Sequence, residues 1–227
     1  AWKVLAHVYQ AENGWKEAIE PLQRAMAADP LDAVLRNNLG VVLLSLERLA
    51  EAETVLRQAL ALAPDYNKAW VNLATVLRLL GRYEEAEASS RCAVQMDETD
   101  AAAWIQLGNA LEAQDRQAEA QVCYYKADMA HDPRRAVAHS NVIYLLSHDV
   151  LVSPEVLWQE QRAYGQRFEE PLKEARIPCT NGVNPDRRLR IGFVSGDFCH
   201  HALTEFTEPV FKALAQQNVF ECHAYYA

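Results

Sequence analysis

The sequence predicts an array of α-helical hairpins over most of the chain, followed by the beginning of an α/β lobe. Three observations predict this fold class. A 34-residue period runs through the first two thirds of the chain, a cluster of prolines and an Asn-Gly pair occupies residues 171–186, and a β-type segment follows at 188–194. Half of the 227 residues are hydrophobic, so the chain can bury a sizeable core.

The 34-residue period is carried by several residue types. Trp2, Trp70 and Trp104 lie at multiples of 34 residues, and Pro30 and Pro64 share the spacing. Two alanine registers and one leucine register repeat in the same way: Ala18, Ala52, Ala86, Ala120; Ala25, Ala59, Ala93, Ala127; Leu5, Leu39, Leu73, Leu107. This period is typical of the tetratricopeptide repeat, whose hairpins bury their apolar faces only by stacking on neighbours. We therefore expect an α-helical tetratricopeptide superhelix.

Each repeat is predicted to contain two antiparallel helices, for example 67–80 and 83–96. The break falls at Gly81, because glycine can take a positive φ without strain. Gly14 is expected to break the first repeat in the same way. The three tryptophans occupy a packing position on the first helix of a pair, so we interpret them as core residues and not as ligand-stacking groups.

A second periodic set consists of amides. Asn38, Asn72 and Gln106 lie 34 residues apart, and a one-residue insertion near Pro133 brings Asn141 into the same register. An amide both donates and accepts hydrogen bonds, so a ladder of amides along the concave face can bind the backbone of an extended peptide. These four residues are therefore predicted to bind polypeptide substrates. The alternative is that they satisfy polar groups of neighbouring helices or stay hydrated.

The end of the array is marked by Ser153 and Pro154, a capping serine followed by a proline that suits the first position of a helix. The breaker-rich segment that follows indicates a linker. The predicted domains are thus the repeats at 1–148, a capping helix with the linker at 149–186, and the incomplete start of an α/β lobe at 187–227.

The last segment is predicted to contain a strand, a loop, a helix and a second strand. Residues 188–194 alternate in polarity, a helical stretch begins near Ala202 and includes 208–216, and 219–226 is again strand-like. This order belongs to an open parallel sheet, whose ligands bind beyond the carboxyl ends of the strands, here at 195–201. Two strands are too few for an α/β domain, whose sheet is covered on both faces. We therefore expect that the chain is part of a longer protein, and that much of any active site lies outside the chain.

The composition argues against several classes of partner and of site. The formal net charge of -9 argues against nucleic-acid and membrane-surface partners, which need basic patches. No apolar run reaches the roughly 18 residues of a spanning helix, and the first residues lack the order of a signal peptide, so we expect a cytoplasmic protein. The cysteines are odd in number and lack CxxC spacing, which favours reduced thiols and no structural zinc: Cys92, Cys123, Cys179, Cys199 and Cys222.

The repeats, the Ser153-Pro154-Glu155 helix start, the segment LRIGFVSGDF at 189–198 and His201 together resemble the protein O-GlcNAc transferases and their bacterial homologues. The resemblance implies a two-lobed GT-B catalytic region that moves N-acetylglucosamine from UDP-GlcNAc to serine or threonine hydroxyls with inversion. It implies no metal and no cofactor besides the donor substrate. Residues 187–227 would begin the N-terminal, Rossmann-like lobe.

The resemblance also implies a catalytic role for His201. The family motif has a histidine after the Asp-Phe pair, usually followed by proline, where this chain has Ala202. An imidazole can act as a base toward a hydroxyl, or can position the substrate, and the spacing leaves both roles open. We interpret His200 as solvated or structural. Adjacent ligands such as Cys199 and His200 rarely converge on one zinc ion, which disfavours a metal site.

Three functions remain open from the sequence. The leading hypothesis is the O-GlcNAc transferase, with polypeptide substrates on the concave repeat face and a sugar nucleotide as the second partner. A SPINDLY-type protein O-fucosyltransferase would use GDP-fucose, and a non-enzymatic tetratricopeptide adaptor would use the concave face alone. The donor, the protein substrates and any homo-oligomer are left open.

Overall fold

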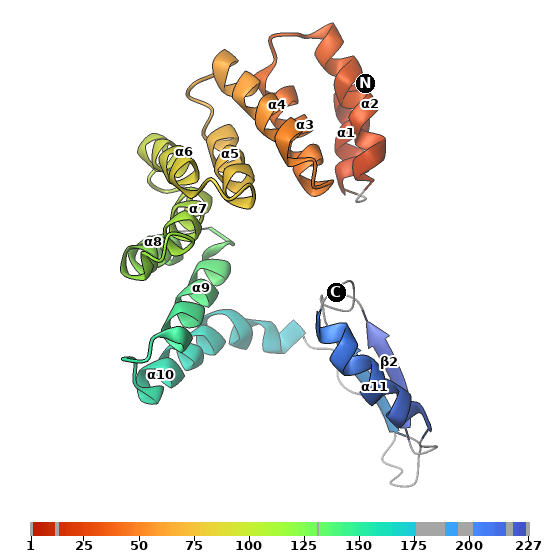
Figure 1. Ribbon diagram of the computed structural model, residues 1–227, viewed down its shortest axis with the longest axis vertical. Helices are drawn as coiled ribbons and strands as arrows, with labels where there is room; N and C mark the ends of the chain where they lie inside the picture. The colour runs from red at the N-terminus through yellow and green to blue at the C-terminus, as the bar shows by residue number, and fades with distance from the viewer. Residues whose placement is uncertain are drawn as a thin grey trace. The chain divides into compact units, whose positions relative to one another are not determined.

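The structure is a computed structural model, and it describes most of the chain. The described residues are 2–11, 14–130, 132–175, 189–194, 202–216 and 220–225. Contacts divide the chain into two compact units, Ala1–Ala175 and Arg176–Ala227, and each is described by itself. The first unit is helical in its described part, whereas the second pairs two strands with a helix (Figure 1).

The first unit is built from helical hairpins that follow one another along a curved path (Figure 1). Its helices are α1 (Trp2–Ala11), α2 (Trp15–Ala28), α3 (Ala33–Ser45), α4 (Leu49–Leu62), α5 (Asn67–Leu79), α6 (Tyr83–Met96), α7 (Ala101–Glu112), α8 (Gln117–Met129), α9 (Arg135–His148) and α10 (Pro154–Tyr164). A π-helical turn, η1 (Gly165–Glu169), and a 3-10 segment, η2 (Glu170–Ala175), continue α10. Each helix from α1 to α10 packs against its neighbours in the chain, as stacked repeats require.

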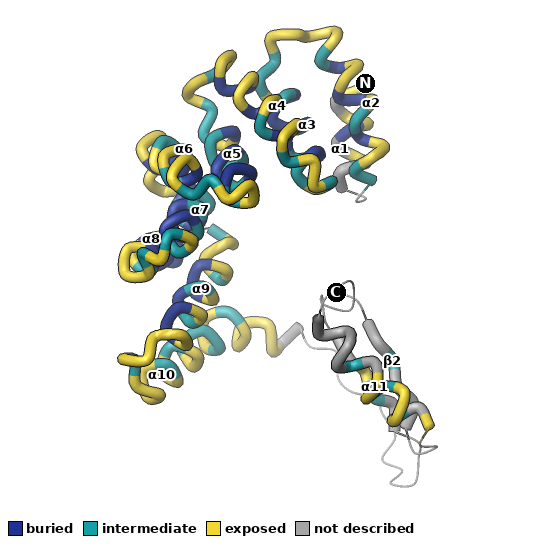
Figure 2. Tube along the Cα trace, in the orientation of Figure 1, coloured by how far each residue is buried: buried dark blue, intermediate teal, exposed yellow. Residues whose placement is uncertain are grey.

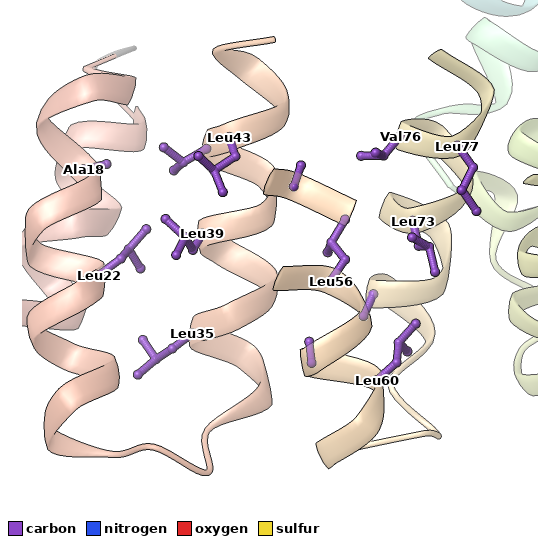
Figure 3. Packing of buried hydrophobic residues seen from close by; sticks show 14 of the residues in the cluster. Ala18, Leu22, Leu35, Leu39, Leu43, Leu56, Leu60, Leu73, Val76 and Leu77 are labelled. Atoms are coloured by element: carbon purple, nitrogen blue, oxygen red, sulfur yellow. The ribbon is translucent and has the colours of Figure 1, made fainter. Parts of the chain in front are cut away.

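The periodic alanines and leucines form the core of the array. The register that begins at Ala18 is fully buried in all four repeats. Figure 3 shows Leu22 of α2 facing the leucines of α3, and Leu56 of α4 facing Leu73 of α5. Each fully buried leucine stabilises the fold by about 1.5–3 kcal/mol. Figure 2 shows the same arrangement along the array, with buried positions between helices and exposed positions outside.

Side chains cap several of the helices. Asp32 and Asp100 stand before α3 and α7 and accept hydrogen bonds from backbone N–H groups of the first turn, at 3.1 and 2.9 Å. Ser153 caps α10 in the same way at 3.4 Å, with Pro154 in the first turn. The start predicted for that helix is confirmed. Such caps satisfy N–H groups that have no partner inside the helix.

The turns of the hairpins α3–α4, α5–α6 and α7–α8 each contain one residue in the left-handed region. Gly81 has φ of 76°, as predicted, and the residues 34 positions away, Glu47 and Asp115, have φ of 58° and 60°. Gly14 lies in the predicted break between α1 and α2, but the positive φ expected for it was wrong, because its φ is -79° and it is the N-cap of α2. Gly14 lies one position later in the repeat than Gly81, where the backbone needs no positive φ.

The tryptophans lie at the junctions between repeats and are less buried than core leucines. Trp70 and Trp104 are half-buried, and their indole N–H groups donate to the carbonyl oxygens of Pro64 and Glu98, both at 2.8 Å. Trp2 is 40% exposed. Trp70 and Trp104 therefore pack at the junctions and also hold the preceding loops through exposed hydrogen bonds.

The second unit contains β1 (Leu189–Val194), α11 (Ala202–Gln216) and β2 (Phe220–Tyr225). The two strands pair in parallel, from Leu189 opposite Phe220 to Val194 opposite Tyr225. Their order along the chain is the order expected from the sequence, while a larger Rossmann-like lobe stays a proposal. None of the described helices is both long and apolar enough to span a lipid bilayer.

Candidate functional site

A groove of ≈ 930 Å³ runs across the first helices of successive repeats. Its walls come from α3, α5, α7 and the start of α9, together with the loops that precede α7 and α9. The floor combines amides with apolar side chains, among them Val41, Val71, Ile105 and Val137. Pockets of this mixed character bind ligands by burying apolar groups and by orienting them through a few polar contacts.

Two of the four predicted ladder residues, Asn72 and Gln106, line this groove. Asn38 is outside its lining but contacts the neighbouring amide Asn37, whose Nδ2 donates to Asn38 Oδ1 at 3.5 Å. Asn141, on α9, is also outside the lining. The structure thus brings Asn72 and Gln106 into one site, and the binding role of all four residues stays a prediction.

Asn37 is a groove residue that the sequence reasoning missed. It is 4% exposed, and its Oδ1 accepts a hydrogen bond of 2.8 Å from Nδ2 of Asn72 on the next repeat. This bond fits the alternative interpretation, in which amides satisfy one another between helices. The only signal in the sequence was that Asn37 stands beside the periodic Asn38. The Asn37–Asn72 pair therefore links α3 to α5 beneath the groove.

Two acceptors of the groove have no hydrogen-bond partner. Oδ1 of Asn67 and Oε1 of Gln106 are shielded from solvent and unpaired. The amide of Asn67 is oriented by its other end, because Nδ2 donates to Asp100 at 3.3 Å. An unsatisfied buried acceptor costs about 1–3 kcal/mol. A small turn of either side chain toward a donor in the groove would remove this cost, so both residues favour a ligand that carries N–H groups.

The rim of the groove is held together by Asp100. One carboxylate oxygen of Asp100 accepts from Asn67, and the other lies 3.3 Å from Nη1 of Arg134. Asn67, Asp100 and Arg134 come from three successive repeats, so these contacts connect the three repeats along the rim of the groove. The hydroxyl and the backbone N–H of Thr99 donate to Asp97, and these bonds hold the pKa of the Asp97 carboxyl below its usual range. The Asp97 carboxyl therefore stays charged at neutral pH.

The predicted catalytic residue, His201, lies outside the described residues, as do Cys199 and His200. In the described part of the chain, no three His, Cys, Asp or Glu side chains are grouped so that they could hold a metal ion. Cys92 and Cys123 are free thiols. Burial raises the pKa of Cys123 to about 11, so this thiol is protonated at neutral pH.

Comparison with known proteins identifies the repeat. Residues 4–67 and 46–100 match the sequence profile of the family described as the tetratricopeptide repeat. With the stacked hairpins of α1 to α9, this match identifies a tetratricopeptide-repeat array within the chain. The repeat predicted from the 34-residue period is confirmed.

Individual proteins share parts of this array. Protein FlbA of Caulobacter vibrioides is 41% identical over 66 residues, which cover 29% of this chain and 11% of FlbA. A mutant O-GlcNAc transferase of Thermobaculum terrenum superposes with a TM-score of 0.67 and 28% identity, over 78% of this chain and 34% of that chain. MamA of Desulfovibrio magneticus RS-1 superposes with a TM-score of 0.62 and 18% identity, over 73% of this chain and 92% of MamA.

These comparisons concern the repeats. The chain spans about a third of the length of the transferase that it matches, and about a ninth of FlbA. The likeness to MamA shows the fold alone. No catalytic domain is shown in the part of the chain that the structure describes. Any enzymatic activity is therefore a proposal.

Proposed function

We propose that the array is a polypeptide-binding module and that an extended segment of a partner protein lies in the groove across α3, α5 and α7. The observation that carries the proposal is the floor of the groove. There, Asn72 and Gln106 come from successive repeats, and the acceptors of Asn67 and Gln106 are unpaired. The backbone N–H groups of an extended peptide are donors of the required kind.

The apolar part of the groove suits the side chains of such a peptide. Val71 and Ile105 occupy the same position in successive repeats and lie next in sequence to the ladder residues Asn72 and Gln106. A peptide can thus bury side chains on the apolar residues while its backbone reaches the amides. Backbone recognition of this kind admits many sequences, which suits an adaptor with several partners.

Selection from a phage-displayed library of short random peptides tests this function. We expect the native chain to enrich peptides, and the double variant Asn72→Ala, Gln106→Ala to bind the selected peptides at least about tenfold more weakly, as for the loss of one or two hydrogen bonds. The matched control is Gln58→Ala, Gln95→Ala, which removes exposed amides from α4 and α6. Absence of enrichment by the folded native chain would contradict the proposal.

A second candidate function is favoured by the comparison with the O-GlcNAc transferase, because the similarity extends over 78% of this chain at 28% identity. In this proposal the groove recruits polypeptides for a transferase lobe that begins near residue 187. That lobe would use UDP-GlcNAc, or GDP-fucose as in SPINDLY-type enzymes. His201 would deprotonate or position the acceptor hydroxyl.

This second function is tested on the full-length protein with both donors and an acceptor polypeptide. Transfer of N-acetylglucosamine that is severely reduced by His201→Ala, with an unchanged circular dichroism spectrum, is the expected result. Transfer from GDP-fucose would identify the other enzyme. No transfer from either donor would leave the adaptor as the function of the protein.

A further inference from the structure

A smaller pocket of ≈ 360 Å³ lies where α5 and α7 end. Arg78, Asn109, Glu112 and Ala113 line it. Asn109 follows Thr75 by 34 residues, and Thr75 lines the large groove. Thr75 of the groove and Arg78 of the pocket lie one turn apart on the same side of α5, so the pocket lies beside the groove. A ligand in the groove can therefore extend into it.

Arg78 differs from the other arginines of the first unit. It is half-buried, and its Nε is shielded from solvent without a hydrogen-bond partner. Among the arginines described in residues 2–175, each of the others has a hydrogen bond, an ion pair or an aromatic ring as partner: Arg24, Arg36, Arg48, Arg57, Arg82, Arg91, Arg116, Arg134, Arg135, Arg162 and Arg167. A shielded guanidinium donor without an acceptor indicates a place for a ligand acceptor.

The carboxylate of the same pocket is engaged elsewhere. Oε2 of Glu112 accepts the hydroxyl of Tyr124 at 2.7 Å, and Oδ1 of Asn109 lies 2.8 Å from that hydroxyl. The hydroxyl has one hydrogen, so these two oxygens are alternative acceptors for it, and the carboxylate of Glu112 is the stronger of the two. Glu112 is thereby held by Tyr124 and forms no ion pair with Arg78, although both line the pocket.

The two charges select the chemistry of the ligand. A ligand carboxylate would be attracted by Arg78 but repelled by Glu112. A ligand ammonium would be attracted by Glu112 but repelled by Arg78. A carboxamide has no net charge, and it can accept from Arg78 through its oxygen while it donates to Glu112 through its nitrogen.

We propose that this pocket binds a carboxamide side chain, asparagine or glutamine, of the polypeptide in the groove. The inference rests on the proposed peptide-binding function and adds a sequence preference to it. Backbone contacts to the amides admit many peptides, and the pocket at Arg78 and Glu112 chooses among them.

The test uses the same library of short random peptides on the native chain and on two variants. The native chain should enrich asparagine or glutamine at one position, and a resynthesised peptide with alanine there should bind about tenfold more weakly. Arg78→Met keeps an unbranched apolar side chain without the donors, and should capture peptides with no preference for a carboxamide. Arg24→Met, on α2, is the matched control and should leave the preference intact.

Glu112→Gln gives the sharper result. It keeps an acceptor for Tyr124 but removes the negative charge, so the preference should move toward aspartate or glutamate, which Arg78 can then bind without repulsion. Enrichment of peptides without a carboxamide preference, or a preference unaffected by Arg78→Met, would overturn this inference while the peptide-binding function stands. A native chain that enriches nothing overturns both.

Discussion

The ring of Tyr124 on α8 lies against Gly108 on α7 so closely that a methyl group at residue 108 would overlap it. Two repeats earlier, Leu56 fills the same place over Gly40, where a Cβ atom would lie 2.6 Å from Cγ of Leu56. Within a hairpin, a large residue on the second helix thus faces a glycine on the first. The size of one side chain sets the size allowed for the other.

The repeat between them has Ala74 and Ser90 at the equivalent positions, both buried. Gly108→Ala should therefore lower the free energy of unfolding by about 1–3 kcal/mol through overpacking. In a Tyr124→Ser background the overlap is gone, and Gly108→Ala should stabilise by about 0.5–1 kcal/mol, the gain of alanine over glycine in a helix. Urea unfolding of the four proteins measures this change of sign. An equal cost in both backgrounds would show that the two residues are not coupled.

At the left-handed positions of the hairpin turns, introducing a glycine and removing one should have opposite effects on the free energy of unfolding. Glu47→Gly should raise the free energy of unfolding by about 0.5–1 kcal/mol, because glycine relieves the strain of φ at 58°. Gly81→Ala should lower it by about 1 kcal/mol, since alanine meets that strain at φ of 76° although nothing crowds its Cβ. Thermal unfolding measures both, and effects of the same sign would contradict the assigned turn conformation.

Arg82 connects neighbouring repeats through two carboxylates. It lies 2.6 Å from Glu85 in the first turn of α6, the helix that it precedes, and 2.8 Å from Glu53 of the preceding repeat. The equivalent residue Arg48 pairs with Glu51 in the first turn of α4 at 2.7 Å. Arg82→Ala should therefore lower the urea midpoint more than Arg48→Ala, with a difference that shrinks at high salt, because screening weakens exposed pairs. Equal midpoints would mean that the contact between repeats adds no stability.

Glu87 predicts a pH dependence. Burial acts to raise the pKa of this carboxyl, but hydrogen bonds from Gln114 and Arg91 and the charge of Arg116 outweigh it and hold the pKa below its usual range. A lowered folded-state pKa gives stability that is present above the unfolded pKa, about 4.3, and is lost as the pH falls through the folded value.

Glu87→Gln should therefore lower the free energy of unfolding by about 1–2 kcal/mol at neutral pH, with a smaller difference below pH about 4. Denaturant titrations at several pH values measure it. Glu84→Gln, at an exposed position of the same helix, is the control and should show little effect. A difference for Glu87→Gln that stays constant into acid would contradict the assigned charge.

The repeat architecture was predictable because its signals are local and repeated. The helices expected at 67–80 and 83–96 are found at Asn67–Leu79 and Tyr83–Met96. The break at Gly14 was predicted, but its conformation was not, because the glycine was expected to be the left-handed residue, whereas Glu47 and Asp115 take that conformation without being glycines. A non-glycine residue with positive φ leaves little trace in a sequence.

The candidate site was predictable only in part. The 34-residue register placed Asn72 and Gln106 in the groove, since equivalent positions of stacked repeats share a face. The contacts of Asn37 and Asp100 run between repeats, and the unpaired state of Arg78 depends on side-chain geometry, so no spacing reveals them. Polar residues at 32, 66, 100 and 134 share the register, and this spacing could have indicated the rim of the groove.

The most direct test of the account is the affinity of library-selected peptides for the folded native chain and for the variant Asn72→Ala, Gln106→Ala, measured by fluorescence anisotropy. If the groove is the peptide site, the native chain binds the peptides, the groove variant binds them more weakly by about tenfold or more, and Gln58→Ala, Gln95→Ala binds like the native chain. Equal affinities for the native chain and the groove variant would contradict the assignment of the groove as the peptide site.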